Sequence, residues 1–232
     1  MAPSFLCRHL GADRWPAHYG EVHARRPSRV GPAMRVGGLL LAAGAGRRLG
    51  QPKALVPFDG QLLVERGVAL LTGAGCAPVH VVLGAAYDEI LVTADLAEAT
   101  PVHNPAWASG MGSSLRTGLA SLSPEVEAVV VALVDQPLVT AAAVRRLLTA
   151  YQEGATVAVA TYDGQPRNPV LLGRAVWAEV AALAEGDLGA RAYLRAHPEL
   201  LTQVPCDDVG SPDDVDTPQD LATLRERKVA GS

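Results

Sequence analysis

The sequence predicts an α/β fold, a Rossmann-like three-layer sandwich in which a mainly parallel sheet carries helices on both faces. The first observation behind this prediction is that short apolar runs alternate with segments of helical spacing along residues 34–232. The second is that several runs end at a glycine or an aspartate, as expected where buried parallel strands meet a ligand crevice. No linker or internal repeat divides this stretch, so we interpret residues 34–232 as one domain.

The first three elements follow from apolar patterning and from glycine. Residues 36–43 form a continuous apolar run that ends in a glycine-rich turn, which predicts a buried parallel strand. Residues 62–71 have helical spacing and are followed by Gly73 and Gly75, which indicate where a helix ends. Residues 79–83 are rich in β-branched side chains and end at Gly84, which predicts the second strand.

The remaining elements continue the alternation. Residues 128–134 give the clearest strand, because an unbroken apolar run precedes Asp135. Further helices are predicted over residues 86–97, 113–122, 141–151, 175–184, 190–197 and 219–227, and further strands over residues 156–161, 170–172 and 201–205. Sheets of this kind bind ligands beyond the carboxyl ends of their strands, so the informative residues should follow the apolar runs.

Composition excludes several classes of protein. Of the 232 residues, 49% are hydrophobic and 19% are charged, which is a globular balance and not that of a disordered chain. The net charge of −4 argues against a general nucleic-acid binder, and no apolar run is long enough for a membrane helix. Cys7, Cys76 and Cys206 are too few and too scattered for a disulfide framework or a zinc site. We therefore expect reduced thiols in a cytoplasmic protein that binds neither nucleic acid nor membrane.

Residues 1–33 differ from the rest of the chain. They carry five arginines against Asp13 and Glu21, show no sustained periodicity, and lack the apolar core of a secretory signal. We predict a disordered or mis-annotated N-terminal extension with Met34 as the natural start, and keep a targeting arm as the alternative.

The loop from Gly44 to Lys53 suits a polyphosphate. Its small residues let the backbone approach a ligand, and Arg47, Arg48 and Lys53 add three positive charges close together. Two rival motifs fit less well. The glycines are one residue too widely spaced for a dinucleotide fingerprint, and Gly-Gln-Pro-Lys stands where a Walker loop needs Gly-Lys-Ser/Thr. A plain glycine turn with solvated arginines is the remaining alternative.

Two acidic positions are candidates for a metal site. Asp135 ends the strand at residues 128–134, where a carboxylate would point into the crevice and could hold Mg²⁺, although it could equally cap a helix. The run of carboxylates from Asp207 to Asp216 is either an exposed acidic loop or part of a metal site. Carboxylate-bound Mg²⁺ would reduce the repulsion between a triphosphate and a phosphate nucleophile.

Other polar residues are candidates either for binding a ligand or for capping a helix. Ser114 is near the start of a predicted helix, where it would either favour an anion or cap the helix. Arg191 could face a phosphate, with Gly189 supplying flexibility, whereas Asp187 could cap the helix that follows. Asn168 can hydrogen-bond but carries no charge at neutral pH.

Five motifs in chain order resemble those of the MobA-like NTP transferases, most closely the branch that contains molybdenum cofactor (molybdopterin) cytidylyltransferases. The first begins at Leu41 and reads Leu-Ala-Ala-Gly-x-Gly-x-Arg, with a Lys later in the same loop. The second begins at Asn104 and reads Asn-Pro-x-Trp-x-x-Gly-x-x-x-Ser. The other three are Asp-Gln-Pro beginning at Asp135, Gly-Asp-x-Gly-Ala-Arg beginning at Gly186, and Asp-Val-Asp-Thr-Pro beginning at Asp214. The resemblance covers residues 36–226 and implies a fold of the nucleotide-diphospho-sugar transferase type. It departs at Arg167-Asn168, where this branch commonly has Gly-His.

The resemblance implies a role for each matched residue. Arg47, Lys53, Asp135 and Asp216 would be catalytic, the first two on the phosphates of a nucleoside triphosphate and the carboxylates on Mg²⁺, with Mn²⁺ as an alternative metal. The nucleotide would be bound by Leu41, Ala42, Ala43, Gly44, Gly46, Arg47, Lys53, Gly84, Asn104, Gly110 and Ser114. The acceptor would be bound by Asn168, Gly189 and Arg191.

The implied reaction moves a nucleoside monophosphate from a nucleoside triphosphate to a phosphorylated acceptor and releases pyrophosphate. Ala42-Ala43-Gly44 favours CTP, because the guanylyl branch usually has Ala-Gly-Gly there, and molybdopterin is then the expected acceptor. GTP, a sugar phosphate and phospholactate are alternatives, as are a non-catalytic nucleotide- or cofactor-binding module and an NAD-dependent oxidoreductase. Molybdopterin as acceptor would also imply a transient contact with a molybdoenzyme or its chaperone.

Overall fold

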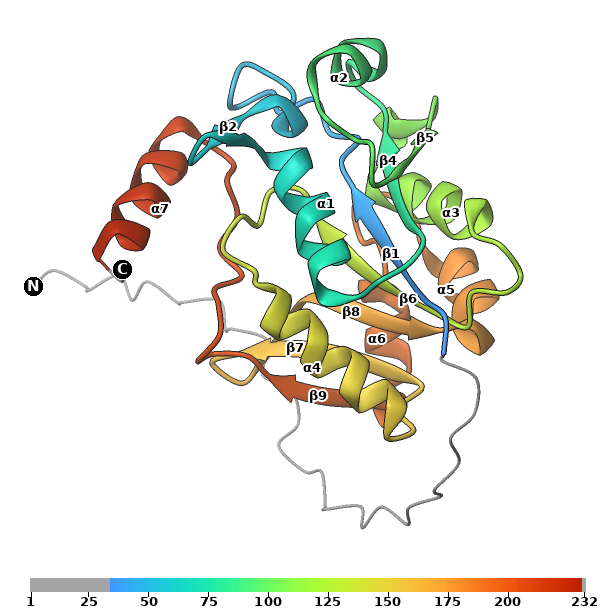
Figure 1. The fold of residues 1–232 in the computed structure, drawn as a ribbon. Helices are drawn as coiled ribbons and strands as arrows, with labels where there is room; N and C mark the ends of the chain where they lie inside the picture. The colour runs from blue at the N-terminus through green and yellow to red at the C-terminus, as the bar shows by residue number, and fades with distance from the viewer. Residues whose placement is uncertain (1–33, 231–232) are drawn as a thin grey trace, which may run out of the picture.

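One sheet of seven strands forms the centre of the computed structural model, which describes residues 34–230 (Figure 1). The strands lie in the order β5-β4-β1-β6-β8-β7-β9. Their bounds are β1 Val36–Leu41, β4 Val79–Leu83, β5 Thr100–His103, β6 Ala128–Leu133, β7 Val157–Tyr162, β8 Gln165–Gly173 and β9 Leu201–Pro205. A separate two-stranded sheet consists of β2 (Pro57–Phe58) and β3 (Gln61–Leu62). β8 runs antiparallel to β6 and β7 while the other pairs of the sheet are parallel, so the mainly parallel sheet is confirmed. The extension predicted over residues 1–33 lies outside the described residues.

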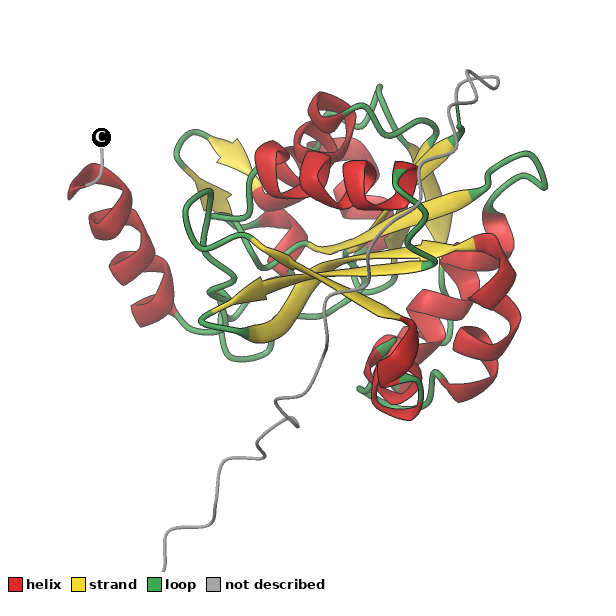
Figure 2. Ribbon diagram, turned by 90° about the horizontal axis from the view of Figure 1, so that it is seen from below, coloured by secondary structure: helices red, strands yellow, loops and turns green. Residues whose placement is uncertain are grey.

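Helices cover both faces of the sheet (Figure 2). α1 (Leu63–Ala74) and α4 (Ala141–Gln152) pack on one face, and α3 (Met111–Ser121), α5 (Trp177–Leu183) and α6 (Arg191–Ala196) pack on the other. α2 (Tyr87–Thr93) follows β4, and α7 (Pro218–Ala230) extends from one end of the body. Short 3₁₀ helices span Lys53–Leu55, Trp107–Ser109, Arg174–Val176 and Pro198–Leu200. No helix among residues 34–230 is long and apolar enough to cross a membrane.

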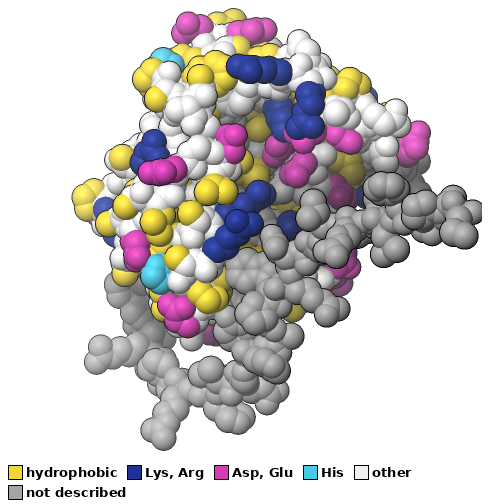
Figure 3. Space-filling view, turned by 180° about the vertical axis from the view of Figure 1, so that it is seen from behind, with side chains coloured by type: hydrophobic (Ala, Val, Ile, Leu, Met, Phe, Trp, Pro, Cys, Tyr) yellow, Lys and Arg dark blue, Asp and Glu magenta, His cyan; other side chains and the backbone are white. Residues whose placement is uncertain are grey.

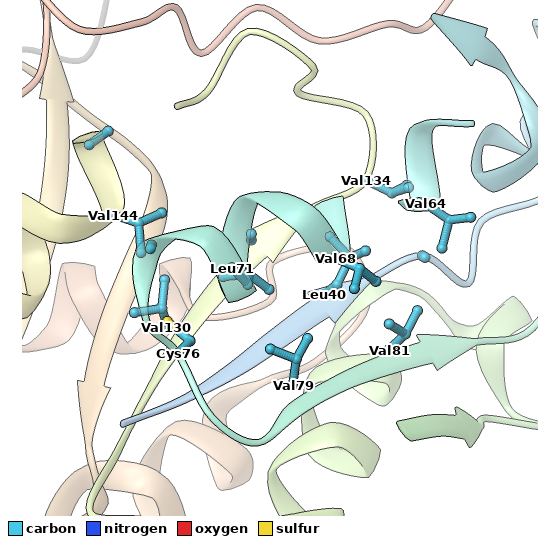
Figure 4. Close-up of a cluster of buried hydrophobic side chains, with 14 of the residues drawn as sticks. Leu40, Val64, Val68, Leu71, Cys76, Val79, Val81, Val130, Val134 and Val144 are labelled. Atoms are coloured by element: carbon cyan, nitrogen blue, oxygen red, sulfur yellow. The ribbon is translucent and has the colours of Figure 1, made fainter. Parts of the chain in front are cut away.

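The core has two layers because successive side chains of a strand point to opposite faces of the sheet. In β1, Leu40 belongs to the layer under α1 and α4, whereas Leu39 and Leu41 belong to the layer under α3 and α5. Figure 4 shows the first layer, in which Val68 and Leu71 of α1 lie over β1. A strand that serves both layers must be apolar throughout, which is why its sequence reads as a continuous run.

The close approach of α1 to β1 depends on Gly67. A Cβ atom there would lie 2.6 Å from both Cδ atoms of Leu40, a fully buried side chain that would have to shift within the core. We expect Gly67→Ala to lower the free energy of unfolding by about 1–3 kcal/mol through overpacking. Gly73→Ala is the control on the same helix, because open space surrounds the added atom and helix propensity should raise stability by up to about 1 kcal/mol. Urea unfolding measures both, and equal effects would contradict the packing argument.

The strand predicted over residues 170–172 is wrong in length. β8 runs from Gln165 to Gly173, and only its second half is fully buried. Its first half is polar and contains Pro166 and Pro169, so the apolar pattern reveals only the part that enters the core. The helix predicted over residues 86–97 also ends early, at Thr93.

β1 lies where the order of the strands reverses. The chain passes from β1 to β4 and β5 on one side, and then to β6 on the other side. The connections therefore diverge beyond the carboxyl ends of these strands and leave a crevice between them. The segments 42–53, 104–114 and 134–137, which carry three of the predicted motifs, all begin at this edge of the sheet.

Candidate active site

The loop after β1 connects the sheet to Lys53. At its start, the amide of Ala42 donates to the carbonyl of Val82 at 2.9 Å, and the carbonyl of Ala43 accepts from the amide of Ala85 at 3.0 Å. The loop then turns at Gly46, whose φ of 58° lies in the left-handed region that favours glycine. These features hold the loop across the carboxyl ends of β1 and β4.

Lys53 lies between two carboxylates that are far apart in the sequence. Its Nζ is 2.6 Å from Oδ2 of Asp135 and 2.5 Å from Oδ1 of Asp216. Arg48 contacts the other oxygen of Asp216, with 2.8 Å between Nη2 and Oδ2. The side chains of Lys53 and Asp135 are 17% and 18% exposed, and that of Asp216 is 34% exposed, so the cluster is shielded but reachable from solvent. The fold thus brings together the two acidic positions that were predicted to hold a metal.

The charges in this cluster stabilise one another. Burial alone would lower the pKa of Lys53, but the charges and hydrogen bonds of Asp135 and Asp216 outweigh it and raise that pKa above its usual value. The hydrogen bond from Lys53 lowers the pKa of Asp216, and burial offsets this only in part. Burial, followed by the charge of Asp135, raises the pKa of nearby Asp214. At neutral pH Lys53 is therefore a cation and Asp216 an anion.

The start of α7 fixes the backbone at Asp216. Oδ2 of Asp220 accepts from the amides of Asp216 at 3.1 Å and Thr217 at 2.8 Å, while Oγ1 of Thr217 accepts from the amide of Asp220 at 3.2 Å. This is the reciprocal cap expected at a helix start. The amide of Val215 also donates to the carbonyl of Asp135 at 2.7 Å, which joins the two acidic segments directly.

The carboxylate pair fits a divalent metal ion. Oδ1 of Asp135 is buried and has no hydrogen-bond partner among residues 34–230, which costs free energy unless a ligand completes it. Within the same residues, no group of three or more His, Cys, Asp or Glu side chains is arranged to hold a metal. A metal on Asp135 and Asp216 would therefore take its other ligands from water or phosphate oxygens, as Mg²⁺ commonly does.

A cleft of about 360 Å³ includes Lys53 and Asp135 in its lining. Of the residues predicted for the nucleotide, the cleft is lined by Leu41, Ala43, Gly44, Gly46, Arg47, Lys53, Gly110 and Ser114. Trp107, Met111 and Asp187 line it as well, although they were not among the predicted site residues. Trp107 could have been predicted as a cleft residue, because it lies within the Asn-Pro-x-Trp motif. Nothing in the sequence indicated that Met111 would line the cleft.

Three residues predicted for the nucleotide lie behind the wall of this cleft. Ala42 is buried in the core under α1. Gly84 is buried against Trp107, whose side chain a Cβ at Gly84 would overlap. Asn104 is buried too, and its amide nitrogen donates to Oγ of Ser114 at 3.0 Å. In the structure, Gly84 and Asn104 contact the wall residues Trp107 and Ser114, and their direct contact with the nucleotide stays a prediction.

The residues predicted to bind the acceptor do not line the cleft, and two of them line other cavities. Asn168 and Arg191 line a cavity of about 630 Å³ that also includes Gln136 and Asp214, and they line a smaller cavity of about 190 Å³. Gly189 lines neither of these cavities, and a Cβ there would lie 3.0 Å from Sδ of Met111. Gly189 thus allows its loop to approach α3.

Backbone meets backbone where this loop contacts α3. A Cβ at Gly110 would overlap the backbone of Gly186, and a Cβ at Gly112 would overlap the carbonyl of Ala184. The amide of Gly112 donates to the carbonyl of Gly186 at 2.8 Å. Only glycine permits this contact, which lies beside the cleft that Gly110 lines.

Asp187 does not cap the helix that follows it. α6 begins after Ala190 without a side-chain cap, and Oδ1 of Asp187 instead accepts from the amide of Met111 at 3.4 Å, at the start of α3. The interpretation of Asp187 as a helix cap is therefore wrong, and its side chain makes a tertiary contact beside the cleft instead.

A comparison with known families identifies the family of the chain. Residues 38–201 match the MobA-like NTP transferase domain. The chain belongs to the MobA-like NTP transferase family. The resemblance to the family is thereby confirmed, and nucleotidyl transfer from a nucleoside triphosphate is the chemistry that the family supports. Four of the five motifs lie within the matched residues, and the motif from Asp214 lies beyond them.

Three known proteins show how far the similarity to this MobA-like chain extends. Nicotine blue oxidoreductase of Paenarthrobacter nicotinovorans is 39% identical over 197 residues, which cover 82% of this chain and 96% of that protein. The molybdenum cofactor guanylyltransferase of Xanthomonas euvesicatoria is 36% identical over 118 residues, covering 50% of this chain and 54% of that protein. The structure of Rv0371c from Mycobacterium tuberculosis in complex with manganese has a TM-score of 0.72 at 27% identity and covers 83% of this chain and 99% of that chain.

Two glycines of the MobA-like loop are expected to respond differently to substitution. A Cβ at Gly46 would overlap the carbonyl oxygen of Gln51, whereas Gly44 lines the cleft and has open space around it. We expect Gly46→Ala to distort the loop and lower the melting temperature. Gly44→Ala should leave the melting temperature unchanged and raise the KM for the triphosphate about tenfold, because the methyl group enters the space of the ligand. Thermal melts and steady-state kinetics separate the two effects, and a Gly44→Ala variant with normal KM would contradict this placement of the ligand.

Proposed function

We propose that residues 34–232 of this protein form a Mg²⁺-dependent nucleotidyltransferase domain, which moves CMP from CTP to molybdopterin and releases pyrophosphate. The observation that carries the proposal is the cluster of Lys53, Asp135 and Asp216 beside the cleft that the glycine loop lines. It supplies a cation for phosphates and two carboxylates for a metal at one place. Nucleotidyl transfer between two anionic reactants requires both.

In the proposed reaction, a phosphate oxygen of the acceptor attacks the α-phosphorus of CTP. The bond from that phosphorus to the bridging oxygen breaks, and its electron pair leaves with pyrophosphate. Arg47 and Lys53 bind the triphosphate and stabilise the charge that develops on the leaving group. Held by Asp135 and Asp216, Mg²⁺ would neutralise the charge of the reactants. No covalent intermediate with the protein is required, because holding the two reactants in line supplies much of the rate.

The nucleotide choice rests on the start of the loop. Ala43 lines the cleft beside Leu41, at the position where the guanylyl branch usually has glycine, and the backbone there is expected to read the base. The Xanthomonas guanylyltransferase makes GTP the alternative to test.

The test begins with the change in melting temperature caused by each of the four nucleoside triphosphates, with and without Mg²⁺. We expect a Mg²⁺-dependent increase that is greatest with CTP, followed by pyrophosphate release when molybdopterin is added. A greatest increase with GTP would overturn the nucleotide assignment. Absence of both a thermal shift and pyrophosphate release with all four nucleotides would overturn nucleotidyl transfer.

A second candidate function is reduction by a nicotinamide dinucleotide. The observation in its favour is the 39% identity to a protein named nicotine blue oxidoreductase, over nearly the full length of that protein. Against it stands the glycine spacing of the loop, which is one residue too long for a dinucleotide fingerprint. Incubation with NADH or NADPH and nicotine blue decides, because loss of the reduced-nicotinamide absorbance would establish this activity.

A further inference from the structure

A cavity of about 780 Å³ lies between α1, the start of α4 and the segment that joins β6 to α4. Its volume is typical of a small-molecule site. Its lining includes Arg66 and Leu70, which helical spacing places on one face of α1. α1 and α4 lie in front of the sheet in Figure 1, whereas Figure 3 shows the molecule from behind. Asn168, Gly189 and Arg191, which were predicted to bind the acceptor, do not line this cavity.

Apolar side chains contribute much of the lining of this cavity. Leu63 and Val139 are buried parts of the core, whereas Leu70 and Leu138 are half-buried and Ala69 is exposed. The last three therefore leave apolar surface open at the cavity. A ligand that covered them would remove this surface from water, which favours binding.

Arg66 carries a charge that no carboxylate balances. Of the described residues that line the cavity, Arg66 and Arg227 are charged, and Arg227 pairs with Asp213 at 2.7 Å. The guanidinium of Arg66 lies 5.1 Å from the centre of the Phe58 ring, and its Nη2 donates to the carbonyl of Pro137 at 3.1 Å. Within residues 34–230, Arg66 has no carboxylate partner, and the lining contains no aspartate or glutamate. An arginine without a counter-ion in such a cavity favours an anionic ligand.

The guanidinium of Arg66 also has a hydrogen-bond donor that makes no contact. Its Nε is buried and has no partner among residues 34–230, which costs free energy. Of the buried side-chain nitrogen and oxygen atoms without a partner in that range, it is the only nitrogen. If the guanidinium turned towards the cavity, Nε and Nη2 would face one anion as a planar pair of donors. A single anion there would supply both a hydrogen-bond acceptor and a counter-charge.

The hydrogen bond of Arg66 connects the cavity with the candidate metal site. Pro137, whose carbonyl accepts this bond, is buried and follows Asp135 closely in the sequence. Leu133 and Val134, just before Asp135, line both this cavity and the nucleotide cleft. A ligand that competed for Arg66 would release the carbonyl of Pro137 and loosen the segment that positions Asp135.

We propose that this cavity is a regulatory site for an amphipathic anion, a small molecule with an apolar body and one carboxylate-like group. Its body would cover Ala69, Leu70 and Leu138, and its anion would bind Arg66. Charge-assisted hydrogen bonds are about twice as strong as neutral ones, so the anion would draw the guanidinium away from the carbonyl of Pro137. Metal binding at Asp135 would then weaken. This regulatory effect rests on the proposed nucleotidyl transfer, whereas the binding site does not.

Other classes of ligand match the cavity less well. A simple inorganic anion would leave the apolar side chains uncovered. A neutral apolar molecule would leave Arg66 without a counter-ion. A polyanion such as a nucleoside triphosphate would bring more charge than one unpaired arginine can balance, and the rest of that charge would lose its hydration beside apolar side chains.

The binding test compares three probes on the full chain. The probe that combines apolar rings with an anion is 8-anilinonaphthalene-1-sulfonate. N-phenyl-1-naphthylamine has the same rings without the anion, and inorganic sulfate is an anion alone. Fluorescence reports binding of the two ring probes, and calorimetry reports binding of sulfate. We expect the sulfonate to bind at least about tenfold more tightly than either partial probe, because hydrogen bonds to a charged group or the apolar contacts are otherwise lost. Equal affinity of the two ring probes would overturn the proposal.

Three variants assign this binding to the cavity. Arg66→Gln should weaken the sulfonate about tenfold and leave N-phenyl-1-naphthylamine unchanged. Ala69→Phe should weaken both ring probes severalfold, since a phenyl group at this exposed position of α1 would fill the cavity while Arg66 keeps its contacts. Arg145→Gln is the matched control, because Arg145 is an exposed arginine of α4 that donates to a carbonyl and lies outside the lining. Sulfonate binding that survives both Arg66→Gln and Ala69→Phe would overturn the proposal.

The regulatory effect is measured as Mn²⁺ affinity, by electron paramagnetic resonance with and without saturating sulfonate. We expect the sulfonate to weaken Mn²⁺ binding about fivefold or more, and Mn²⁺ to weaken sulfonate binding by the same factor, because such coupling is reciprocal. Ala69→Phe should abolish this response, and Arg145→Gln should preserve it. Unchanged Mn²⁺ affinity in the protein with bound sulfonate would overturn the regulatory effect.

The change in melting temperature with CTP and Mg²⁺ is measured on the same proteins, so that this inference and the proposed function fail separately. A normal CTP shift without Arg66-dependent sulfonate binding would overturn the regulatory site alone. Sulfonate binding that depends on Arg66, with no shift by any nucleotide and no pyrophosphate release, would overturn nucleotidyl transfer and support the binding site.

Discussion

Asp135→Asn is expected to lower kcat by on the order of 10³-fold while the protein stays folded. The substitution removes one of the two carboxylates that would hold the metal, and several kcal/mol of charge stabilisation depend on that metal. The fold should tolerate the change, because the uncharged amide has nearly the same shape and Lys53, which loses its ion pair with Asp135, keeps the one with Asp216. Turnover, the melting temperature and Mn²⁺ binding by electron paramagnetic resonance measure the three consequences.

Asp216→Asn should behave like Asp135→Asn, and Asp213→Asn is the control for both. Asp213 belongs to the same acidic segment but pairs with Arg227 at 2.7 Å on the surface, so its loss should change kcat less than about twofold. Near-normal turnover or unchanged Mn²⁺ binding in the Asp135 variant would refute its assignment as a metal ligand.

Lys53→Met is expected to lower kcat/KM for the triphosphate by about 10²-fold, because a buried cation that stabilises developing phosphate charge is lost. The same variant should bind Mn²⁺ more tightly than the wild type when no nucleotide is present. In the wild type the ammonium group lies within hydrogen-bond distance of both carboxylates and competes with the metal for them. A variant that loses catalytic efficiency but gains metal affinity would therefore indicate that Lys53 and the metal compete for the same two carboxylates.

Arg48→Gln provides the comparison for Lys53→Met. Arg48 also pairs with Asp216, but its side chain is 68% exposed, so its removal should change metal affinity and kcat/KM by no more than a few-fold. A Lys53→Met variant with weakened Mn²⁺ binding would show that Lys53 organises the carboxylates for the metal, contrary to our expectation.

The parts of the fold that could be predicted are those in which a buried element is apolar on its own. The strands predicted over residues 79–83 and 201–205 match β4 and β9, and β1, β6 and β7 differ only by one or two residues at their ends. β8 was foreshortened because half of it is exposed, and the β2–β3 pair was missed because two-residue strands carry no periodicity. Residues 94–97 were read as helix because buried Leu96 continues the apolar spacing beyond the end of α2.

The candidate site could be predicted only in part from the residues themselves. Charge and glycine content indicated a phosphate loop ending at Lys53, but no spacing rule predicts that Lys53 meets Asp216, 163 positions away. The resemblance to a family implied that Lys53, Asp135 and Asp216 serve one site, but the direct contact between Lys53 and Asp216 was not predicted. Asp187 was beyond both kinds of reasoning, because its local sequence favours a cap and a contact with α3 replaces that role.

The glycine contact between α3 and residues 184–186 has a thermodynamic consequence. The backbone of α3 contacts the backbone of the loop there, so a displacement of one of them cannot be accommodated by a change of side-chain rotamer. A shift of α3 by ligand on one side of the contact must then reach the loop on the other side. Linkage makes such an effect reciprocal: the factor by which nucleotide changes the affinity for acceptor equals the factor by which acceptor changes the affinity for nucleotide. Two glycines would in this way tie together the occupancies of two cavities that share a wall.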